Sequence, residues 1–458
     1  MYNLKKIIAV FIIPVIMLFA FPFVGFAAET PIYDPAFDNG KGALFANGTS
    51  ITISEISGNT VASWDGGSQI IPLTARIFGG GTIGTSFDSS QITMESGTVR
   101  SIYGGGFSTD SAQIATVNES SVVINGGTVS TSLYGGGLLY TTTNKTNVVV
   151  NGGTVYSVLG GGSSSATIGG VSYSTGTEDH PEDSLTRVNE ANVIVNGGTI
   201  DSLWGGGQGY SYTGNSILTI NGNPDINYVT GGGSNGYTGS ISVFVNGGTI
   251  STLQTVNRGT VDNSEVYISG GTITTLYVGG EDAVDVTGTV NNAVLNILGG
   301  TVTNINAGKS GDLPLDLTKP EYQVVMVDGV VVNDNIPGAG TIITFVASID
   351  QENTILFKNG TKTLNVVITT TPTGYESSFL NIPVQWISSD ETVVVVDETG
   401  MITGVNPGSA IVSATIAGQT VSANIRVYDT SAVVFIITCI LIALVLLCLG
   451  FCYFNRRF

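Results

Sequence analysis

The stretch VVINGGTVSTSLYGGG, residues 122–137, contains an apolar triplet, a glycine turn, a second apolar stretch and three glycines. Two near copies follow, VVVNGGTVYSVLGGG at 148–162 and VIVNGGTIDSLWGGG at 193–207. Recurrence of this kind marks a repeat architecture, in which each unit buries its apolar face against the next unit. These copies therefore decide the fold of the longest part of the chain.

The period of the repeat predicts a solenoid. Most copies are separated by about 23 to 31 residues, which is the range of solenoid repeats. The longest gap contains an insertion at about residues 163–190. The runs of three glycines begin at Gly79, Gly104, Gly135, Gly160, Gly205 and Gly231.

Four positions of every copy are apolar, and in the first copy they are Val122, Ile124, Val129 and Leu133. Their spacing within each stretch is mostly even, which is the period of a β-strand. A strand this short cannot bury its face alone, whereas stacked strands bury a continuous core. The repeat therefore predicts a parallel β-solenoid over residues 77–311, in a chain that is otherwise all-β apart from one C-terminal transmembrane helix.

The repeats resemble those of right-handed parallel β-helix proteins. Their glycines suit tight corners where φ is positive and where no Cβ fits. One corner carries a recurring asparagine, and stacked side-chain amides can hydrogen-bond along such a ladder. The ladder is expected to contain Asn125, Asn151, Asn196, Asn221 and Asn246.

Two segments flank the predicted solenoid. Residues 28–76 contain short strand-like pieces and are expected to form an N-terminal cap or the first turns, because terminal repeats are atypical. Residues 312–351 are expected to form a C-terminal cap or connector. Within them, YQVVMVDGVVVNDN at 322–335 predicts a hairpin around Asp328 and Gly329.

Short alternating strands and turns replace the repeat over residues 352–429, and this spacing indicates a β-sandwich. Residues 384–427 resemble a bacterial immunoglobulin-like domain of group 2. Trp386, the turn at 388–390, the segment 397–400 and the segment 404–408 carry the resemblance. It implies a stalk module of the kind found in bacterial surface proteins and adhesins, with Trp386 in the core.

Both ends of the chain carry membrane signals. Residues 1–27 have a basic start, an apolar run and small residues at the cleavage position, which predicts a signal peptide; an uncleaved anchor is the alternative. Residues 432–454 are apolar and long enough to span a bilayer. The tail at 455–458 contains two arginines and is expected to be cytoplasmic. The prediction is a single-pass protein of the cell membrane, with its N-terminal part displayed at the cell surface.

The C-terminal end resembles that of Gram-positive sortase substrates, because an apolar helix precedes two arginines. The Leu-Pro-x-Thr-Gly signal is absent, and VYDTSAVV at 427–434 stands in its place. This difference favours a protein retained in the membrane over one attached covalently to the cell wall.

Composition argues against nucleic acid as a partner and against disulfides or thiolate metal sites in the exterior part. The formal net charge is −19 and only 11% of residues are charged, so we expect no binding to nucleic acid, which needs clustered lysines and arginines. The three cysteines, Cys439, Cys448 and Cys452, all lie in the predicted anchor. The exterior part therefore lacks a disulfide framework and a thiolate metal site.

Residues suited to catalysis or metal binding are few. His180 is the only histidine and lies in the insertion, next to the acidic residues Glu178, Asp179, Glu182 and Asp183. The spacing matches no calcium loop, which favours a solvated loop over a cation site. A second acidic group, Glu281, Asp282 and Asp285, is interpreted in the same way. We expect no cofactor, no metal and no enzymatic activity.

One pattern suggests binding. Aromatic residues recur just before the glycine runs and follow an inward position by one, so they are expected to point outward. An exposed line of rings can stack on sugars or anchor a protein on a host or neighbouring cell. The alternative is a stack that stabilises the fold beneath the N-terminal segment or the insertion. The residues are Phe78, Tyr103, Tyr134, Trp204 and Tyr277.

Three functions fit this sequence. The first is a non-catalytic surface protein that serves adhesion or cell-surface architecture, with the solenoid displayed on an Ig-like stalk. The second is a tethered polysaccharide lyase or hydrolase, which requires a pair of carboxylates in a groove on the solenoid. The third is binding of ice or mineral through a column of threonines. The column contains Thr98, Thr128, Thr154, Thr199, Thr249, Thr272 and Thr301.

Overall fold

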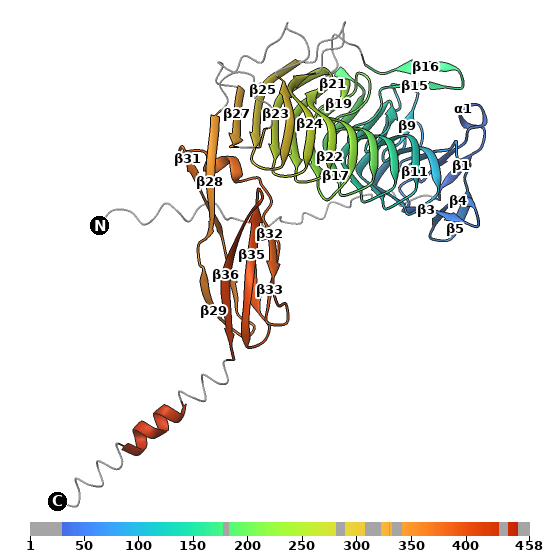
Figure 1. The fold of residues 1–458 in the computed structure, drawn as a ribbon. Coiled ribbons are helices and arrows are strands. Elements are labelled where there is room, and N and C mark those ends of the chain that lie inside the picture. The colour runs from blue at the N-terminus through green and yellow to red at the C-terminus, as the bar shows by residue number, and fades with distance from the viewer. Residues whose placement is uncertain are drawn as a thin grey trace, which may run out of the picture.

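The computed structural model describes residues 30–176, 183–280, 289–306, 322–328, 330–331, 341–429 and 438–447. Strands dominate them, as predicted, and form a β-solenoid of about eight turns followed by an Ig-like domain (Figure 1). The predicted signal peptide, residues 1–27, and the predicted tail, 455–458, lie outside the described residues.

Each solenoid turn contributes one long strand to a 14-stranded sheet. Equivalent positions of successive turns lie side by side, so that Val122 is aligned with Ile92 on one side and Val148 on the other. The parallel strands of this sheet are β7 (Ser86–Met94), β10 (Ala115–Ile124), β13 (Thr141–Val150), β17 (Thr186–Val195), β19 (Tyr212–Ile220), β21 (Ser234–Val245), β23 (Arg258–Ile268), β25 (Thr289–Ile297) and β27 (Tyr322–Val327).

The second half of each turn belongs to an 11-stranded sheet, which is parallel except for its first pair. Its strands are β1 (Ile32–Asp34), β2 (Ala43–Phe45), β6 (Arg76–Phe78), β8 (Thr98–Tyr103), β11 (Thr128–Tyr134), β14 (Thr154–Leu159), β18 (Thr199–Trp204), β20 (Asp225–Thr230), β22 (Thr249–Val256), β24 (Thr272–Gly280) and β26 (Thr301–Asn306).

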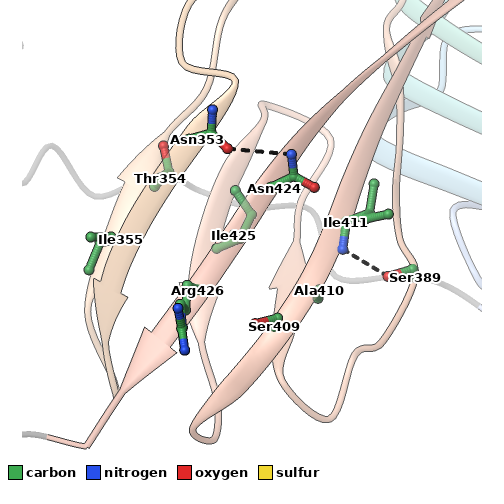
Figure 2. A pocket seen from close by; sticks show the side chains of 10 residues that line it. All are labelled: Asn353, Thr354, Ile355, Ser389, Ser409, Ala410, Ile411, Asn424, Ile425 and Arg426. Atoms are coloured by element: carbon green, nitrogen blue, oxygen red, sulfur yellow. Dashed lines mark hydrogen bonds between the residues drawn. The ribbon is translucent and has the colours of Figure 1, made fainter.

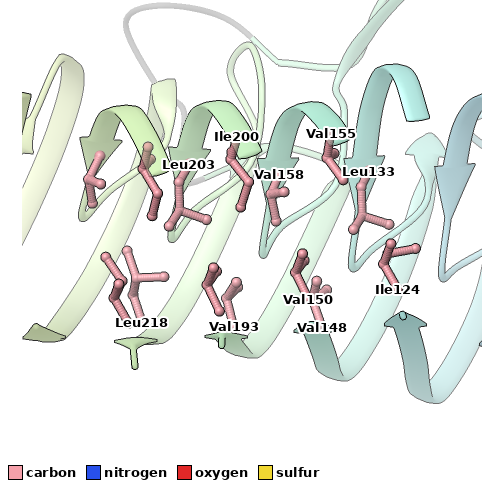
Figure 3. Close-up of a cluster of buried hydrophobic side chains, with 14 of the residues drawn as sticks. Ile124, Leu133, Val148, Val150, Val155, Val158, Val193, Ile200, Leu203 and Leu218 are labelled. Atoms are coloured by element: carbon pink, nitrogen blue, oxygen red, sulfur yellow. The ribbon is translucent and has the colours of Figure 1, made fainter. Parts of the chain in front are cut away.

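The main core lies between these two sheets. All four predicted apolar columns belong to one buried cluster, in which Val122, Ile124, Val129 and Leu133 have no exposed surface. Figure 3 shows side chains of the two sheets facing each other, turn after turn. The alternation read from the sequence is therefore confirmed, because one face of each strand enters this core.

The glycines serve two different corners. In the Asn-Gly-Gly-Thr corner the second glycine has positive φ, +83° at Gly127, which other residues adopt at a cost. In the triple-glycine corner the limit is space, because a Cβ on Gly104 would lie 2.3 Å from the carbonyl oxygen of Gly135. Stacked backbones thus exclude any side chain at the first glycine of that run.

The asparagine ladder forms as predicted. The Asn151 amide donates to the Asn125 side-chain oxygen at 2.8 Å, and the Asn196 amide donates to Asn151 at 2.9 Å. The ladder continues through Asn221 and Asn246, with distances of 3.1 and 3.0 Å. Each turn is therefore tied to the next by a side chain as well as by the backbone.

The N-terminal end of the solenoid is closed by an antiparallel unit. Strands β3 (Ile51–Ile56), β4 (Asn59–Trp64) and β5 (Gly67–Ile70) are antiparallel to one another, and β3 also pairs in parallel with β7. A short turn, α1 (Phe37–Gly40), lies between β1 and β2. The insertion folds back as a hairpin of β15 (Ser165–Ile168) and β16 (Val171–Ser174).

The predicted hairpin around Asp328 and Gly329 is wrong. Strand β27 pairs in parallel with β25 and with β28 (Thr341–Ile349), and Val331 forms a parallel bridge with Val302. The reason is apolar patterning, because Val324 and Met326 continue the buried column of the main core. The segment therefore adds to the solenoid instead of folding back on itself.

The Ig-like domain is a sandwich of two small sheets. One contains β29 (Asn353–Phe357), β36 (Gln419–Tyr428), β35 (Gly408–Ile416) and β32 (Gln385–Ser388), in that order. The other contains β30 (Thr361–Thr363), β34 (Met401–Gly404) and β33 (Val394–Val396). Their facing residues form a separate core, and Trp386 packs against it half-buried.

Strand β28 joins the two domains. Its first residues pair with β27 of the solenoid, and its later residues pair with β31 (Val366–Thr371) of the Ig-like part. Tyr267 and Leu298 of the solenoid share a buried cluster with Phe345 and Ile382. The junction is thus a packed interface with a shared strand (Figure 1).

The predicted transmembrane segment, residues 432–454, is described only over residues 438–447, which are helical. Within the part of the chain that the structure describes, no helix has the length and apolar character needed to cross a membrane.

Candidate binding groove on the solenoid face

The aromatic line predicted as an exposed binding site is largely buried. Phe78, Tyr103 and Tyr134 have exposed fractions of 0%, 5% and 3%. Their rings form a parallel stack, with centroids 4.8 Å apart from Phe78 to Tyr103 and 4.7 Å apart from Tyr103 to Tyr134. The expectation that these rings are exposed is wrong for all three.

A second layer of chain explains the error. The rings point away from the main core, as the alternation requires, but Phe37 and Phe45 of the N-terminal segment cover them together with Phe107 and Leu138. Ala166 and Ile168 of the inserted hairpin pack against the same cluster. The alternative interpretation, a stack beneath the N-terminal segment and the insertion, is therefore the observed one.

The other two predicted residues lie apart from the stack. Trp204 is half-buried and packs against the edge of the same cluster, whereas Tyr277 is half-buried six strands further along the sheet from Tyr103. Burial raises the pKa of Tyr103 and Tyr134 well above its usual value. Neither phenol is therefore suited to lose its proton near neutral pH.

An ionic cluster fixes the same end of the molecule. The buried carboxylate of Asp38 contacts Arg76 at 3.0 Å, Arg100 at 2.9 Å and Lys41 at 3.2 Å. Its other oxygen accepts a hydrogen bond of 3.1 Å from the backbone of Gly169 in the inserted hairpin. Asp38 thus joins the cap, two turns and the insertion.

The outer face of the 11-stranded sheet offers a different surface. Each turn places equivalent residues in aligned columns, so a residue in one turn can be compared with its equivalents in the other turns. The first column is the threonine column predicted from the sequence, and it is aligned from Thr98 to Thr301 with Asp225 as its one non-threonine. In the next column, hydroxyl residues occupy four of the eight positions, Ser130, Ser251, Thr274 and Thr303.

A third column contains Tyr228 among serines and threonines. Apart from Arg100 on β8 and Asn304 on β26, the departures from hydroxyl residues in the three columns gather on three adjacent strands. Tyr156 lies on β14, Asp201 on β18, and Asp225, Asn227 and Tyr228 lie on β20. These strands are neighbours in the order β14, β18, β20. Hydroxyl residues at the same positions of other turns stack without difficulty, so the requirements of the fold do not account for these five side chains.

A groove coincides with the departures. It has a volume of about 360 Å³ and is lined by residues of four consecutive strands, β11, β14, β18 and β20. We call it the Tyr156 groove. Its polar and aromatic lining residues are Thr128, Ser130, Thr154, Tyr156, Thr199, Asp201, Asp225 and Asn227.

The side chains of the Tyr156 groove are presented to solvent in a defined arrangement. Tyr156 is 58% exposed, and Tyr228 beside the groove is 42% exposed. The Asn227 amide donates to one oxygen of Asp201 at 3.2 Å, and the Ser202 hydroxyl donates to the other at 3.1 Å. The carboxylate is therefore held in place by two neutral donors on a rigid sheet.

The sequence prediction missed this site although a signal was present. Tyr156 follows the inward Val155 and Asp201 follows the inward Ile200, so simple alternation places both side chains outward. Periodicity selects the regular aromatic line first, because Tyr156 and Asp201 occur at positions where other turns have serine or threonine. In a repeat protein, an outward residue that breaks the repeat is the more informative one.

A second groove lies on the Ig-like domain. Figure 2 shows it over strands β29, β36 and β35, with Ile355 and Arg426 on one side and Ile411 and Ser389 on the other. It has a volume of about 620 Å³ and is an open sheet face. The Ser389 hydroxyl accepts a hydrogen bond of 2.8 Å from the Ile411 backbone, which ties the loop to the sheet edge.

No group of three or more histidine, cysteine, aspartate or glutamate side chains suited to a metal ion occurs among the described residues. His180 with Glu178, Asp179 and Glu182, and the second acidic group of Glu281, Asp282 and Asp285, lie outside them.

Comparison with protein families identifies one part of the chain. The two sheets after β28 already have the order of an Ig-like sandwich, with Trp386 beside their core. Residues 344–427 are a bacterial Ig-like domain of group 2. This domain begins before the boundary predicted at residue 352 and includes most of β28. No curated protein matches the chain.

Proposed function

We propose that this chain is a non-catalytic, membrane-anchored bacterial surface protein that binds an extracellular ligand through the Tyr156 groove, in adhesion or cell-surface architecture. A β-solenoid followed by a group 2 Ig-like domain fits a surface protein, and domains of this family occur in such proteins. The basic start and apolar run of residues 1–27 and the apolar run at 432–454 favour export and anchoring in the cell membrane.

The observation that carries the binding function is the gathering of Tyr156, Asp201, Asp225, Asn227 and Tyr228 on three adjacent strands. An exposed ring offers a flat apolar face to a sugar, and fixed carboxylate and amide groups accept and donate hydrogen bonds to its hydroxyls. A glycan on a host or neighbouring cell is the ligand that this set of groups favours.

The test is a binding assay on glycan arrays and on whole cells with the full-length chain in detergent. We expect binding that falls about fivefold or more in Tyr156→Ala, since a stacked ring contributes roughly 1 kcal/mol or more. The matched control is Thr274→Ala, which changes an outward residue of the same sheet on β24, two strands beyond the last strand of the groove. Equal binding by wild type and Tyr156→Ala would contradict the proposal.

A second candidate is a tethered polysaccharide hydrolase, because two carboxylates do line one groove. Asp225 is aligned with Thr199, two residues before Asp201 on the neighbouring strand. The backbones of diagonal neighbours of this kind lie roughly 7–8 Å apart, so their carboxyl groups can reach a similar separation. Inverting glycosidases hold their two carboxyl groups at about 6.5–9.5 Å, with a water molecule between.

Release of reducing ends from polysaccharides separates the two candidates. A hydrolase should lose turnover by about 100-fold or more in both Asp201→Asn and Asp225→Asn, because general acid–base catalysis contributes 10²–10⁴-fold. We expect no turnover above background by the wild-type chain. Turnover that either variant abolishes would replace the non-catalytic proposal by the enzymatic one.

A further inference from the structure

The chemistry of the Tyr156 groove restricts its ligand further, and this inference rests on the proposed binding function. The groove contains two carboxylates, Asp201 and Asp225. Strands β11 to β26 of the 11-stranded sheet contain no lysine or arginine, so no cation of this face neutralises them. The nearest basic residue on the sheet, Arg100 of β8, is paired with Asp38.

The electrostatic field of the whole chain is negative, like the charge of the groove. With a net charge of −19, the protein repels anionic polymers and attracts cationic ones to a face that bears exposed carboxylates. Anionic ligands such as uronic acid polymers, sulfated glycans and polyphosphates are therefore disfavoured. A ligand with amino groups gains charge-assisted hydrogen bonds to Asp201 and Asp225, and an ammonium group is also attracted to the ring face of Tyr156.

The direction of the groove indicates a linear polymer. Its lining comes from four adjacent parallel strands, so it runs across the strands and along the solenoid axis. Strands spaced by about 4.8 Å give the groove a length of roughly 14 Å. A chain laid along this axis meets one turn of the solenoid after another.

A glycan fits this surface better than a peptide. An extended peptide usually binds a sheet through a free edge, where backbone groups are unpaired. Strand β18 is paired on both sides, with β14 and with β20, so the groove floor offers no such edge. It offers instead a tyrosine ring, hydroxyls and an amide, which match a polymer of sugar rings.

We propose that the Tyr156 groove binds a linear amino-sugar polymer with free amino groups, which interact with Asp201 and Asp225 while a sugar ring stacks on Tyr156. The polymer lies along the solenoid axis. This is a non-covalent recognition surface, and its selectivity is for the amine over the acetamide form of the same sugar.

The test compares two polymers of equal length, one N-acetylated and one de-N-acetylated, for binding to the full-length chain by interferometry. We expect the free-amine polymer to bind about tenfold more tightly at low salt, since each of two exposed charge pairs strengthens binding by roughly two- to fivefold. High salt should remove this preference. The double variant Asp201→Asn, Asp225→Asn should remove it as well, and Tyr156→Ala should weaken binding of both polymers.

The outcomes distinguish failure of the amine selectivity from failure of the proposed glycan binding. Equal affinity for the two polymers, with both lost in Tyr156→Ala, would overturn the amine selectivity and leave a glycan-binding groove. Absence of binding to any glycan would overturn both. Displacement of the polymer by an oligolysine of equal charge, at equal concentration, would overturn the glycan class, because charge alone would then explain recognition. Thr274→Ala must behave as wild type, and thermal unfolding must show that each variant is folded.

Discussion

The side-chain amide of Asn381 donates a hydrogen bond of 3.3 Å to the hydroxyl of Tyr267, and this contact links the Ig-like domain to the solenoid. Around it, Phe345 and Ile382 pack on Tyr267 and Leu298. The two domains are thus held by a buried apolar cluster as well as by the shared strand β28. Such a junction restricts the angle between the two domains.

Phe345→Ala should weaken this junction strongly. The side chain is buried, and truncation of a buried phenylalanine costs about 3–5 kcal/mol. We expect calorimetry to show one coupled unfolding transition for the wild type and two separate transitions for the variant. Tyr267→Phe removes only the hydrogen bond and should cost about 1 kcal/mol. Coupled unfolding that survives Phe345→Ala would show that β28 alone joins the domains.

The Asp38 cluster predicts an acid-sensitive cap. Burial by itself would raise the pKa of Asp38, but the Gly169 amide, Arg76, Lys41 and Arg100 together lower it below its usual value. Its stabilising contribution is therefore complete above the ordinary aspartate pKa of about 3.9 and is lost as pH falls through that value toward the lower folded pKa. Thermal unfolding between pH 6 and pH 3 measures this loss.

Asp38→Asn is the matched variant for that pH series. It leaves the partly buried arginines without their counter-charge, which should cost about 3 kcal/mol at neutral pH. Because the variant lacks the titrating carboxylate, the stability difference from wild type should shrink toward pH 3. A difference that stays constant across the series would contradict the assignment of the acid sensitivity to Asp38.

Gly104 and Gly58 are glycines for two different reasons, which are close approach of another backbone at Gly104 and a positive φ at Gly58. Gly104→Ala places a Cβ against the Gly135 carbonyl oxygen and should cost about 3 kcal/mol or more, because stacked backbones cannot move apart. Gly58 has a φ of +78° with open space around it, so Gly58→Ala should cost only about 1–2 kcal/mol. Urea unfolding of both variants gives the comparison, and equal costs would contradict it.

Tyr103 tests the reassigned aromatic stack. We expect Tyr103→Ala to destabilise the solenoid by about 3–5 kcal/mol, and Tyr103→Phe to cost less than about 1 kcal/mol, because the ring fills a buried stack. Glycan binding per folded molecule should be unchanged in Tyr103→Phe. A loss of binding in a fully stable Tyr103→Ala variant would restore this residue to the ligand site.

Local pattern was enough to predict the solenoid. Val122, Ile124, Val129 and Leu133 recur at fixed spacing, and stacking then determines parallel pairing and the inward face. The resemblance of the segment around Trp386 to group 2 Ig-like domains was confirmed for the same reason, since its turns and strands are local.

Contacts between distant segments were not predictable in this way. Tyr103 is buried by Phe37 and by the inserted hairpin, which no periodicity places there. Asp38 meets Arg100 across 62 residues of sequence. The Tyr156 groove was predictable only in part. Alternation gives the outward direction of Tyr156, but only the strand order, with β18 next to β20, brings Asp201 and Asp225 together.

The central claim is that the residues of the groove that differ from the serines and threonines of other turns bind a glycan. The most direct measurement restores the repeat by changing Tyr156→Ser, Asp201→Ser, Asp225→Thr, Asn227→Ser and Tyr228→Thr together, and compares glycan binding and thermal unfolding with wild type. The account predicts unchanged or higher stability, since the new residues are those of neighbouring turns, with binding lost. Binding that persists in this folded variant would contradict it.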